Sequence, residues 1–155
     1  MKSYIGVILL CTVAACQNAG TNIQDESKEL TNNLEAVNSI RQVLDNQVIA
    51  WNNGSIDSFM LGYYPSEQLK FITKRGVKTG YDSVQSRYKR YYSTKEKMGR
   101  LSFKNLEFER LSEVPEIFQV TGDWSISGQD SSGGNFSLLV KKIEKDWKII
   151  VDHTW

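Results

Sequence analysis

The sequence has little of what metal sites, nucleotide sites and charged partners require. Its 155 residues include two cysteines and one histidine, too few for a zinc site of the usual Cys/His kind. Nineteen basic and eighteen acidic residues leave a net charge of +1, so no overall field favours nucleic acid or acidic substrates. No Gly-x-Ser-x-Gly elbow, Gly-x-Gly-x-x-Gly motif or P-loop occurs. We therefore expect no metal, no cofactor and no nucleic-acid partner.

The start of the chain is typical of an export signal. Lys2 is followed by an uncharged, mostly apolar run over residues 4–13, about half the length that a membrane-spanning helix needs. This is the length of a secretory h-region. Val13-Ala14-Ala15-Cys16 comes next and resembles a bacterial lipobox, whose cysteine is lipidated and becomes the mature N-terminus. The alternatives are a plain signal peptide or a buried N-terminal helix, with Cys16 an ordinary thiol.

These features predict three parts of the chain. Residues 1–15 are expected to be a lipoprotein signal peptide, and residues 27–155 the folded domain. Between them, residues 16–26 form the lipidated N-terminus and a flexible tether, because the stretch is polar and has little to bury. Two or more acyl chains anchor a protein stably. The expected location is the bacterial cell envelope, at a periplasmic or outer-membrane face.

The first half of the folded part carries a helical pattern. Apolar residues recur every three or four positions over residues 27–53, which predicts one long amphipathic helix ended by Asn53-Gly54. Its predicted apolar stripe is Leu30, Leu34, Val37, Leu44, Val48 and Trp51, with Ile40 beside it. Ser55 can cap a short second helix that Pro65 stops, and residues 81–92 return to helical spacing.

The second half carries a strand pattern. Residues 68–73 and 77–79 predict a hairpin, and a phase change in the apolar alternation near Lys104-Asn105 predicts a β-bulge. In the last strand, strict alternation would place His153 on one face with Trp147 and Ile149. Helices followed by a long meander predict an α+β fold, with about three N-terminal helices packed on a strongly bent, mostly antiparallel sheet. Such a sheet leaves a cone-shaped space beneath the helices.

Three short segments carry a family likeness. They are Ala50-Trp51-Asn52-Asn53-Gly54-Ser55-Ile56-Asp57, Thr79-Gly80 and Trp147-Lys-Ile-Ile-Val-Asp-His153-Thr. With these three segments in this order, the chain resembles the nuclear-transport-factor-2-like superfamily, and within it the SnoaL-like bacterial branch. The likeness covers about residues 35–155. The resemblance implies a cystatin-like cone with an internal pocket, and frequent dimerisation through the outer face of the sheet. It implies no single activity, because the fold serves isomerases, cyclases and binding or assembly modules.

Two residues are candidates for acid–base chemistry. His153 could act as a general base near neutral pH, or it could simply satisfy a hydrogen bond. Asp152 cannot easily assist it, because neighbouring strand residues point to opposite faces. A dyad would need a cross-strand carboxylate, and Asp123 is the first candidate.

Aromatic side chains supply the candidate ligand pocket: Tyr63, Phe71, Tyr88, Trp124 and Trp155. They would either line a cavity for a flat apolar molecule or fill the cone solidly. The preferred interpretation is an exported, lipid-anchored domain that binds a small apolar molecule or a protein partner in its cone. One alternative is a SnoaL-like or ketosteroid-isomerase-like enzyme that uses His153 or Asp123 as its base. The other is a non-catalytic dimeric assembly module, such as a homodimer, whose cone is filled by side chains.

Overall fold

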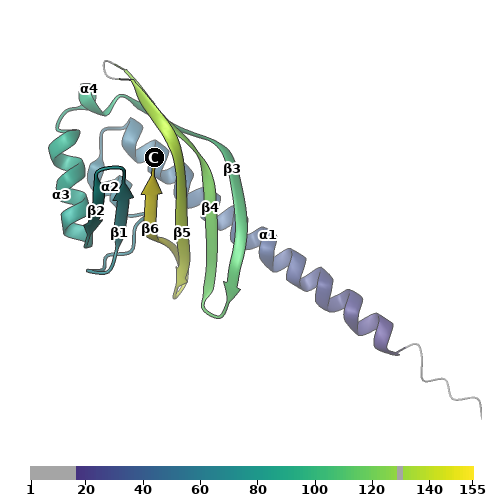
Figure 1. Ribbon diagram of the computed structural model, residues 1–155. Helices are drawn as coiled ribbons and strands as arrows, with labels where there is room; N and C mark the ends of the chain where they lie inside the picture. The colour runs from purple at the N-terminus through teal and green to yellow at the C-terminus, as the bar shows by residue number, and fades with distance from the viewer. Residues whose placement is uncertain (1–16, 129–130) are drawn as a thin grey trace, which may run out of the picture. The chain divides into compact units, whose positions relative to one another are not determined.

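The structure, a computed structural model, describes residues 17–128 and 131–155 (Figure 1). The predicted signal peptide and Cys16 lie outside these residues. A compact unit runs from Glu35 to Trp155. Within the described residues, no helix combines the length and the hydropathy that a membrane crossing demands.

The long helix α1 spans Gln17–Asn52. It begins ten residues before the predicted start, so the backbone of the stretch expected to be a tether is helical. The stretch is polar but contains no proline that would interrupt a helix. The structure confirms Leu44 and Trp51 of the predicted stripe and Ile40 beside it as buried, while Val37 and Val48 are only partly buried. The other side chains that α1 buries are Ala36, Gln47 and Ala50. Leu30 and Leu34 of the predicted stripe are exposed instead.

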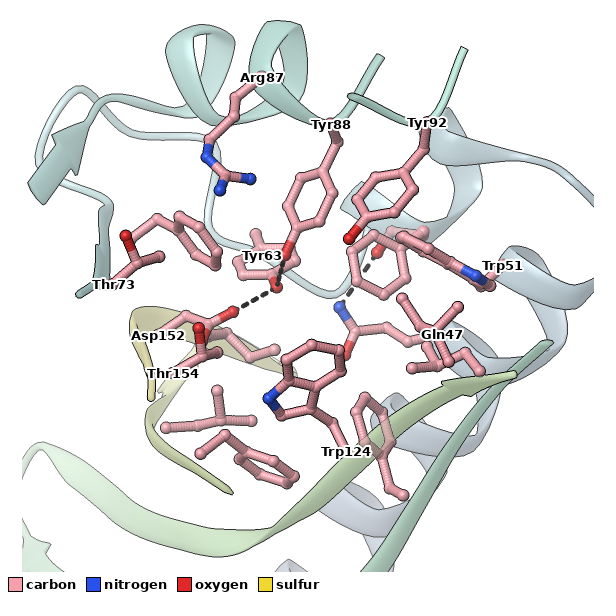
Figure 2. A pocket seen from close by; sticks show the side chains of 18 residues that line it. Gln47, Trp51, Tyr63, Thr73, Arg87, Tyr88, Tyr92, Trp124, Asp152 and Thr154 are labelled. Atoms are coloured by element: carbon pink, nitrogen blue, oxygen red, sulfur yellow. Dashed lines mark hydrogen bonds between the residues drawn. The ribbon is translucent and has the colours of Figure 1, made fainter. Parts of the chain in front are cut away.

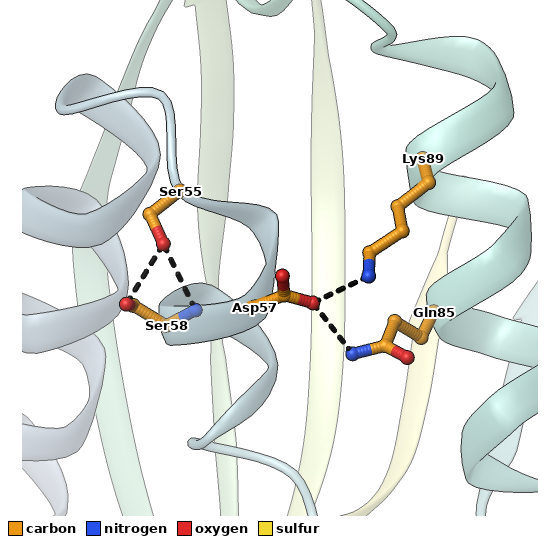
Figure 3. Close-up of polar contacts among 5 residues, drawn as sticks. All are labelled: Ser55, Asp57, Ser58, Gln85 and Lys89. Carbon is orange, nitrogen blue, oxygen red and sulfur yellow. Dashed lines mark hydrogen bonds and ion pairs between the residues drawn. The ribbon is translucent and has the colours of Figure 1, made fainter.

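Three shorter helices follow, α2 (Ile56–Met60), α3 (Tyr81–Tyr91) and α4 (Lys95–Met98). Ser55 caps α2 as predicted, since its side chain accepts a hydrogen bond from the Ser58 backbone N–H. Asp57 then joins α2 to α3 (Figure 3): it accepts a hydrogen bond of 2.9 Å from Gln85 and pairs with the Lys89 ammonium at 2.6 Å. These exposed contacts link the two helices but add little stability.

The described strands form one six-stranded sheet in the order β2-β1-β6-β5-β4-β3. They are β1 (Lys70–Thr73), β2 (Gly76–Thr79), β3 (Arg100–Glu113), β4 (Glu116–Ser127), β5 (Ser132–Ile143) and β6 (Asp146–Thr154). Only β1 and β6 run parallel among these pairs. The long strands β3, β4 and β5 bend strongly (Figure 1). Helices packed against a curled, mostly antiparallel sheet confirm the predicted α+β cone.

Three irregularities shape the sheet. The register between β3 and β4 shifts between Lys104 and Glu107, which confirms the predicted bulge. Two further shifts were not predicted. One lies in β3, between Arg110 and Ser112. In the other, Leu139 pairs with Val151 but Val140 pairs with Ile149, so β6 carries one extra residue. This extra residue reverses the alternation of β6.

The reversal decides which side of β6 faces the helices. Trp147 and Ile149 are buried before the shift, and Asp152 is buried after it, at 5% exposure. His153 is exposed. The expectation that His153 shares a face with Trp147 and Ile149 is therefore wrong, because one inserted residue moves every later side chain to the opposite face.

Candidate functional site

A cavity of about 150 Å³ lies between the helices and the inner face of the sheet (Figure 2). Its walls are mostly aromatic and aliphatic side chains, and polar atoms enter at a few points. We call it the cone cavity. A wider hollow of about 630 Å³ shares with it Thr73, Arg87, Tyr92, Trp124 and Thr154. Because these residues line both spaces, we call the hollow the mouth of the cone cavity.

Asp152 is the acidic residue among those lining the cone cavity. Tyr63 donates a hydrogen bond of 2.7 Å from its hydroxyl to Asp152 Oδ2, and the Tyr88 hydroxyl lies 3.4 Å from that of Tyr63 (Figure 2). Within the described residues, the other carboxyl oxygen, Oδ1, is buried without a hydrogen-bond partner. A buried carboxylate oxygen is costly to leave unpaired, so Oδ1 is a position where an additional donor would be favourable.

The environment of Asp152 changes its proton affinity. Burial raises the pKa of Asp152 to about 6, while the hydrogen bond from Tyr63 and the positive charge of Arg87 act in the opposite direction. Burial also raises the pKa of Tyr63 and of Tyr88, and the negative charge of Asp152 adds to both increases. Both tyrosines therefore stay protonated at neutral pH and act as hydrogen-bond donors. The Asp152 carboxyl group, in contrast, changes from neutral to negative as pH rises through about 6.

A second unpaired polar atom lines the same cavity. Trp124 Nε1 is buried and has no hydrogen-bond partner within the described residues. Its cross-strand partner is Gly134, and a Cβ at that glycine would lie only 3.2 Å from Nε1. The glycine thus leaves room for the indole against the sheet. The residues that line the cone cavity thus include a buried acceptor without a described partner, Asp152 Oδ1, and a buried donor without one, Trp124 Nε1.

Arg87 reaches the same region from α3. Its guanidinium lies 4.8 Å from the ring centre of Phe71 and 4.8 Å from that of Tyr91. No carboxylate of the described residues pairs with it. In Figure 2 the guanidinium points from α3 toward Thr73 and Asp152. It therefore places a positive charge where the cone cavity meets its mouth.

The structure separates the aromatic candidates into two groups. Tyr63, Phe71, Tyr88 and Trp124 line the cone cavity. Trp155 lines the mouth, is 57% exposed, and lies with its ring 4.9 Å from that of His153.

The two candidate bases lie elsewhere. Neither His153 nor Asp123 lines the cone cavity or its mouth. Asp123 instead accepts hydrogen bonds of 2.6 Å from the side chains of Asn105 and Asn135, on the outer side of the sheet. These bonds fasten the β3 bulge, where Asn105 adopts a positive φ of 52°. The structure thus gives Asp123 a structural role and does not bring it together with His153 in a cavity.

Sequence reasoning missed Asp152, Arg87 and Gln47 as cavity residues. Hydrophobic spacing gives no signal for Gln47, a polar residue that is buried on α1 and donates a hydrogen bond to the Phe59 carbonyl at 3.2 Å. Asp152 had none, because its orientation depends on the inserted residue of β6. Among residues 17–128 and 131–155, no three His, Cys, Asp or Glu side chains gather as a metal site would require.

The fold is that of NTF2-like, cystatin-like α+β proteins. An NTF-2 like protein of unknown function from Shewanella oneidensis MR-1 is 36% identical, with a TM-score of 0.72, and the match covers 77% of this chain and 98% of that one. This chain therefore belongs to the NTF2-like family.

More distant structures share the fold alone. LinA is 12% identical over 81% of this chain and 88% of its own, with a TM-score of 0.67. An NTF2-like protein of unknown function from Pseudomonas putida KT2440 is 11% identical over 78% of this chain and 86% of its own, with a TM-score of 0.63. No family model and no curated protein matches the sequence.

Proposed function

We propose that this chain binds a small, mostly apolar molecule in the cone cavity, with Asp152 accepting a hydrogen bond from it. The observation that carries the proposal is the unpaired Asp152 Oδ1, buried in a cavity whose walls are otherwise mostly aromatic and aliphatic. Ionised carboxylates inside proteins are normally paired or hydrogen-bonded at both oxygens. A ligand with one hydroxyl group would supply the missing donor.

The dimensions of the cavity set the size of the molecule. A dry apolar cavity of about 150 Å³ accepts one benzene ring, and the cone cavity has this volume. The part of the ligand inside the cone is therefore about one ring in size, and longer molecules would extend into the mouth. Trp124 Nε1 favours a ligand that also carries an acceptor.

Calorimetric titration with p-cresol and toluene tests the proposal. Both molecules carry a single methylated ring, and only p-cresol carries a hydroxyl. We expect p-cresol to bind at least about tenfold more tightly than toluene, because a hydrogen bond to a charged group contributes about 1.5–3 kcal/mol. In D152N the difference should shrink, since a neutral acceptor forms a weaker bond.

A filled cavity provides the control. Leu138 lines the cone cavity, whereas the next residue, Leu139, does not. We expect L138F to abolish binding of both molecules and L139F to bind as the parent chain does. Binding by L138F equal to that by L139F would refute the cone cavity as the site.

Acid–base catalysis is a second candidate, favoured by the pKa of Asp152. A carboxyl with a pKa of about 6 can take up and return a proton near neutral pH. In this function Asp152, in place of His153 or Asp123, would be the base, and Trp124 Nε1 would donate to the developing oxyanion. Deuterium uptake at the α-carbons of 2-indanone in D₂O tests it. Faster uptake with the parent chain than with D152N supports catalysis. Equal rates would leave ligand binding as the only function proposed for the cavity.

We also propose that the chain is exported and held at a bacterial envelope membrane by a lipidated Cys16. The support is the order of basic residue, apolar run and small residues before Cys16. Mass spectrometry of the mature N-terminus tests it: a diacylated Cys16 is expected, and an unmodified thiol would refute the anchor. A protein partner and a homodimer stay predictions.

A further inference from the structure

The mouth of the cone cavity is lined by cations from separate segments. Lys74 and Arg75 come from the turn between β1 and β2, Arg87 from α3, and Lys97 from α4. No Asp or Glu of the described residues lines the mouth with them. Clustered charges of one sign beside a low-dielectric wall raise the local concentration of the opposite charge. The chain as a whole is nearly neutral, so this concentration of positive charge is local.

Arg87 is the cation best placed to hold a ligand. It lines both the cone cavity and the mouth. Contact with Phe71 and Tyr91 restricts the guanidinium plane and leaves its N–H groups free to donate. Lys89, two residues further along α3, is already paired with Asp57 at 2.6 Å, whereas Arg87 pairs with no described carboxylate. The free N–H groups fit a carboxylate, which accepts two parallel bonds from arginine.

We infer that the ligand of the cone cavity is an amphiphilic carboxylate: an apolar body with a hydroxyl lies in the cone, and the carboxylate lies at the mouth beside Arg87. This inference rests on the proposed binding function and names the class of molecule bound. The ligand hydroxyl donates to Asp152 Oδ1. The ligand carboxylate reduces the repulsion among the four positive side chains of the mouth.

A matched pair of ligands tests the inference on the full chain. 3-(4-Hydroxyphenyl)propanoate and its primary amide share a phenol ring and a linker, and they differ in the charge of the end group. We expect the propanoate to bind at least about tenfold more tightly than the amide, as a partly buried arginine–carboxylate contact allows. We also expect this preference to fall when the ionic strength is raised, because salt screens the mouth.

Two arginine variants provide the control. Arg87→Gln should bring the preference for the propanoate over the amide to within about threefold. Arg90→Gln removes the same charge from the same helix at a residue that lines neither the cone cavity nor the mouth, so the preference should persist.

The outcomes separate the two proposals. Equal affinity of the parent chain for propanoate and amide, or a preference that survives in R87Q, would overturn the inference and leave the proposed binding function standing. Failure of both molecules, together with p-cresol, to bind the parent chain would overturn the binding function and the inference with it.

Discussion

Tyr63 and Asp152 lie 89 positions apart in the chain, and a hydrogen bond of 2.7 Å joins the tyrosine hydroxyl to the carboxyl oxygen Oδ2. Tyr63 follows α2, and Asp152 stands near the end of β6. The backbone brings the two segments together, because the Tyr64 N–H donates to the Ile149 carbonyl and the Ile149 N–H donates to the Gly62 carbonyl. The pair therefore ties the helical layer to the sheet at the position where the cavity is polar.

The stability of the chain should fall as pH rises from about 4 to about 6. The folded state binds the Asp152 proton more tightly than the unfolded state, because the pKa is raised from its ordinary value of 3.8 to about 6. Proton binding by Asp152 therefore adds to the free energy of unfolding below pH 4. This contribution is lost as pH rises through 6, and the loss is about 3 kcal/mol in total. Chemical denaturation at several pH values measures it.

D152N is the control for this pH dependence, because asparagine has the shape of aspartate and does not titrate. The difference in unfolding free energy between the parent chain and D152N should change over pH 4–6 and be constant above pH 7. A constant difference over the whole range would contradict the raised pKa.

Tyr63→Phe should raise the pKa of Asp152 further. The phenol hydroxyl donates a hydrogen bond to the Asp152 carboxylate and so favours its ionised form. The variant loses this hydrogen bond. At pH 8 we expect Y63F to lower the free energy of unfolding by about 1.5–3 kcal/mol, as for a hydrogen bond to a charged group. The cost should be smaller at pH 4, where Asp152 is protonated. An equal cost at both pH values would show that Tyr63 acts through packing alone.

His153→Ala and Asp123→Ala should leave ligand binding unchanged. Neither residue lines the cone cavity or the mouth, so the affinity for p-cresol should match that of the parent chain within about twofold. D123A should still lower stability by about 1 kcal/mol, since it removes the acceptor of the Asn105 and Asn135 side chains. A large loss of p-cresol affinity in either variant would restore these residues as site candidates.

Trp51→Ala should destabilise the chain by about 3–5 kcal/mol. Trp51 is 2% exposed, its ring nitrogen donates to the Met98 carbonyl at 2.9 Å, and its ring lies 5.1 Å from that of Phe59. Trp155→Ala is the matched control, because Trp155 is 57% exposed and should cost less than about 1 kcal/mol. Thermal unfolding of the two variants compares them, and similar losses would contradict the described core.

The sequence predicts the architecture better than the site, for a physical reason. The β3 bulge could be predicted because Leu101, Phe103, Leu106 and Phe108 change phase visibly. The β6 irregularity falls within Ile149-Ile150-Val151, three consecutive apolar residues that carry no alternation from which a phase could be determined. That one residue decides whether Asp152 or His153 faces the helices. The aromatic residues of the cone were easier to predict, because large apolar side chains point inward wherever a cone closes.

The differences between the predicted and the observed buried side of α1 have a related cause. A polar residue at a buried position, Gln47, does not register in a hydrophobic pattern, although it is 2% exposed. Leu30 and Leu34 satisfy the pattern but precede Glu35, where the compact unit begins. Hydrophobic spacing therefore predicts the helix correctly but does not show where its packing partners begin.

The most direct test is a carbon-13 NMR titration of the Asp152 carboxyl, assigned by comparison with D152N, with and without p-cresol. We predict a pKa of about 6 for the free protein and a lower value with p-cresol bound, because a donor at Oδ1 favours the ionised form. A carboxyl that titrates near its ordinary value of 3.8, with the same pKa in the presence of p-cresol, would contradict both the polar end of the cone cavity and its role in binding.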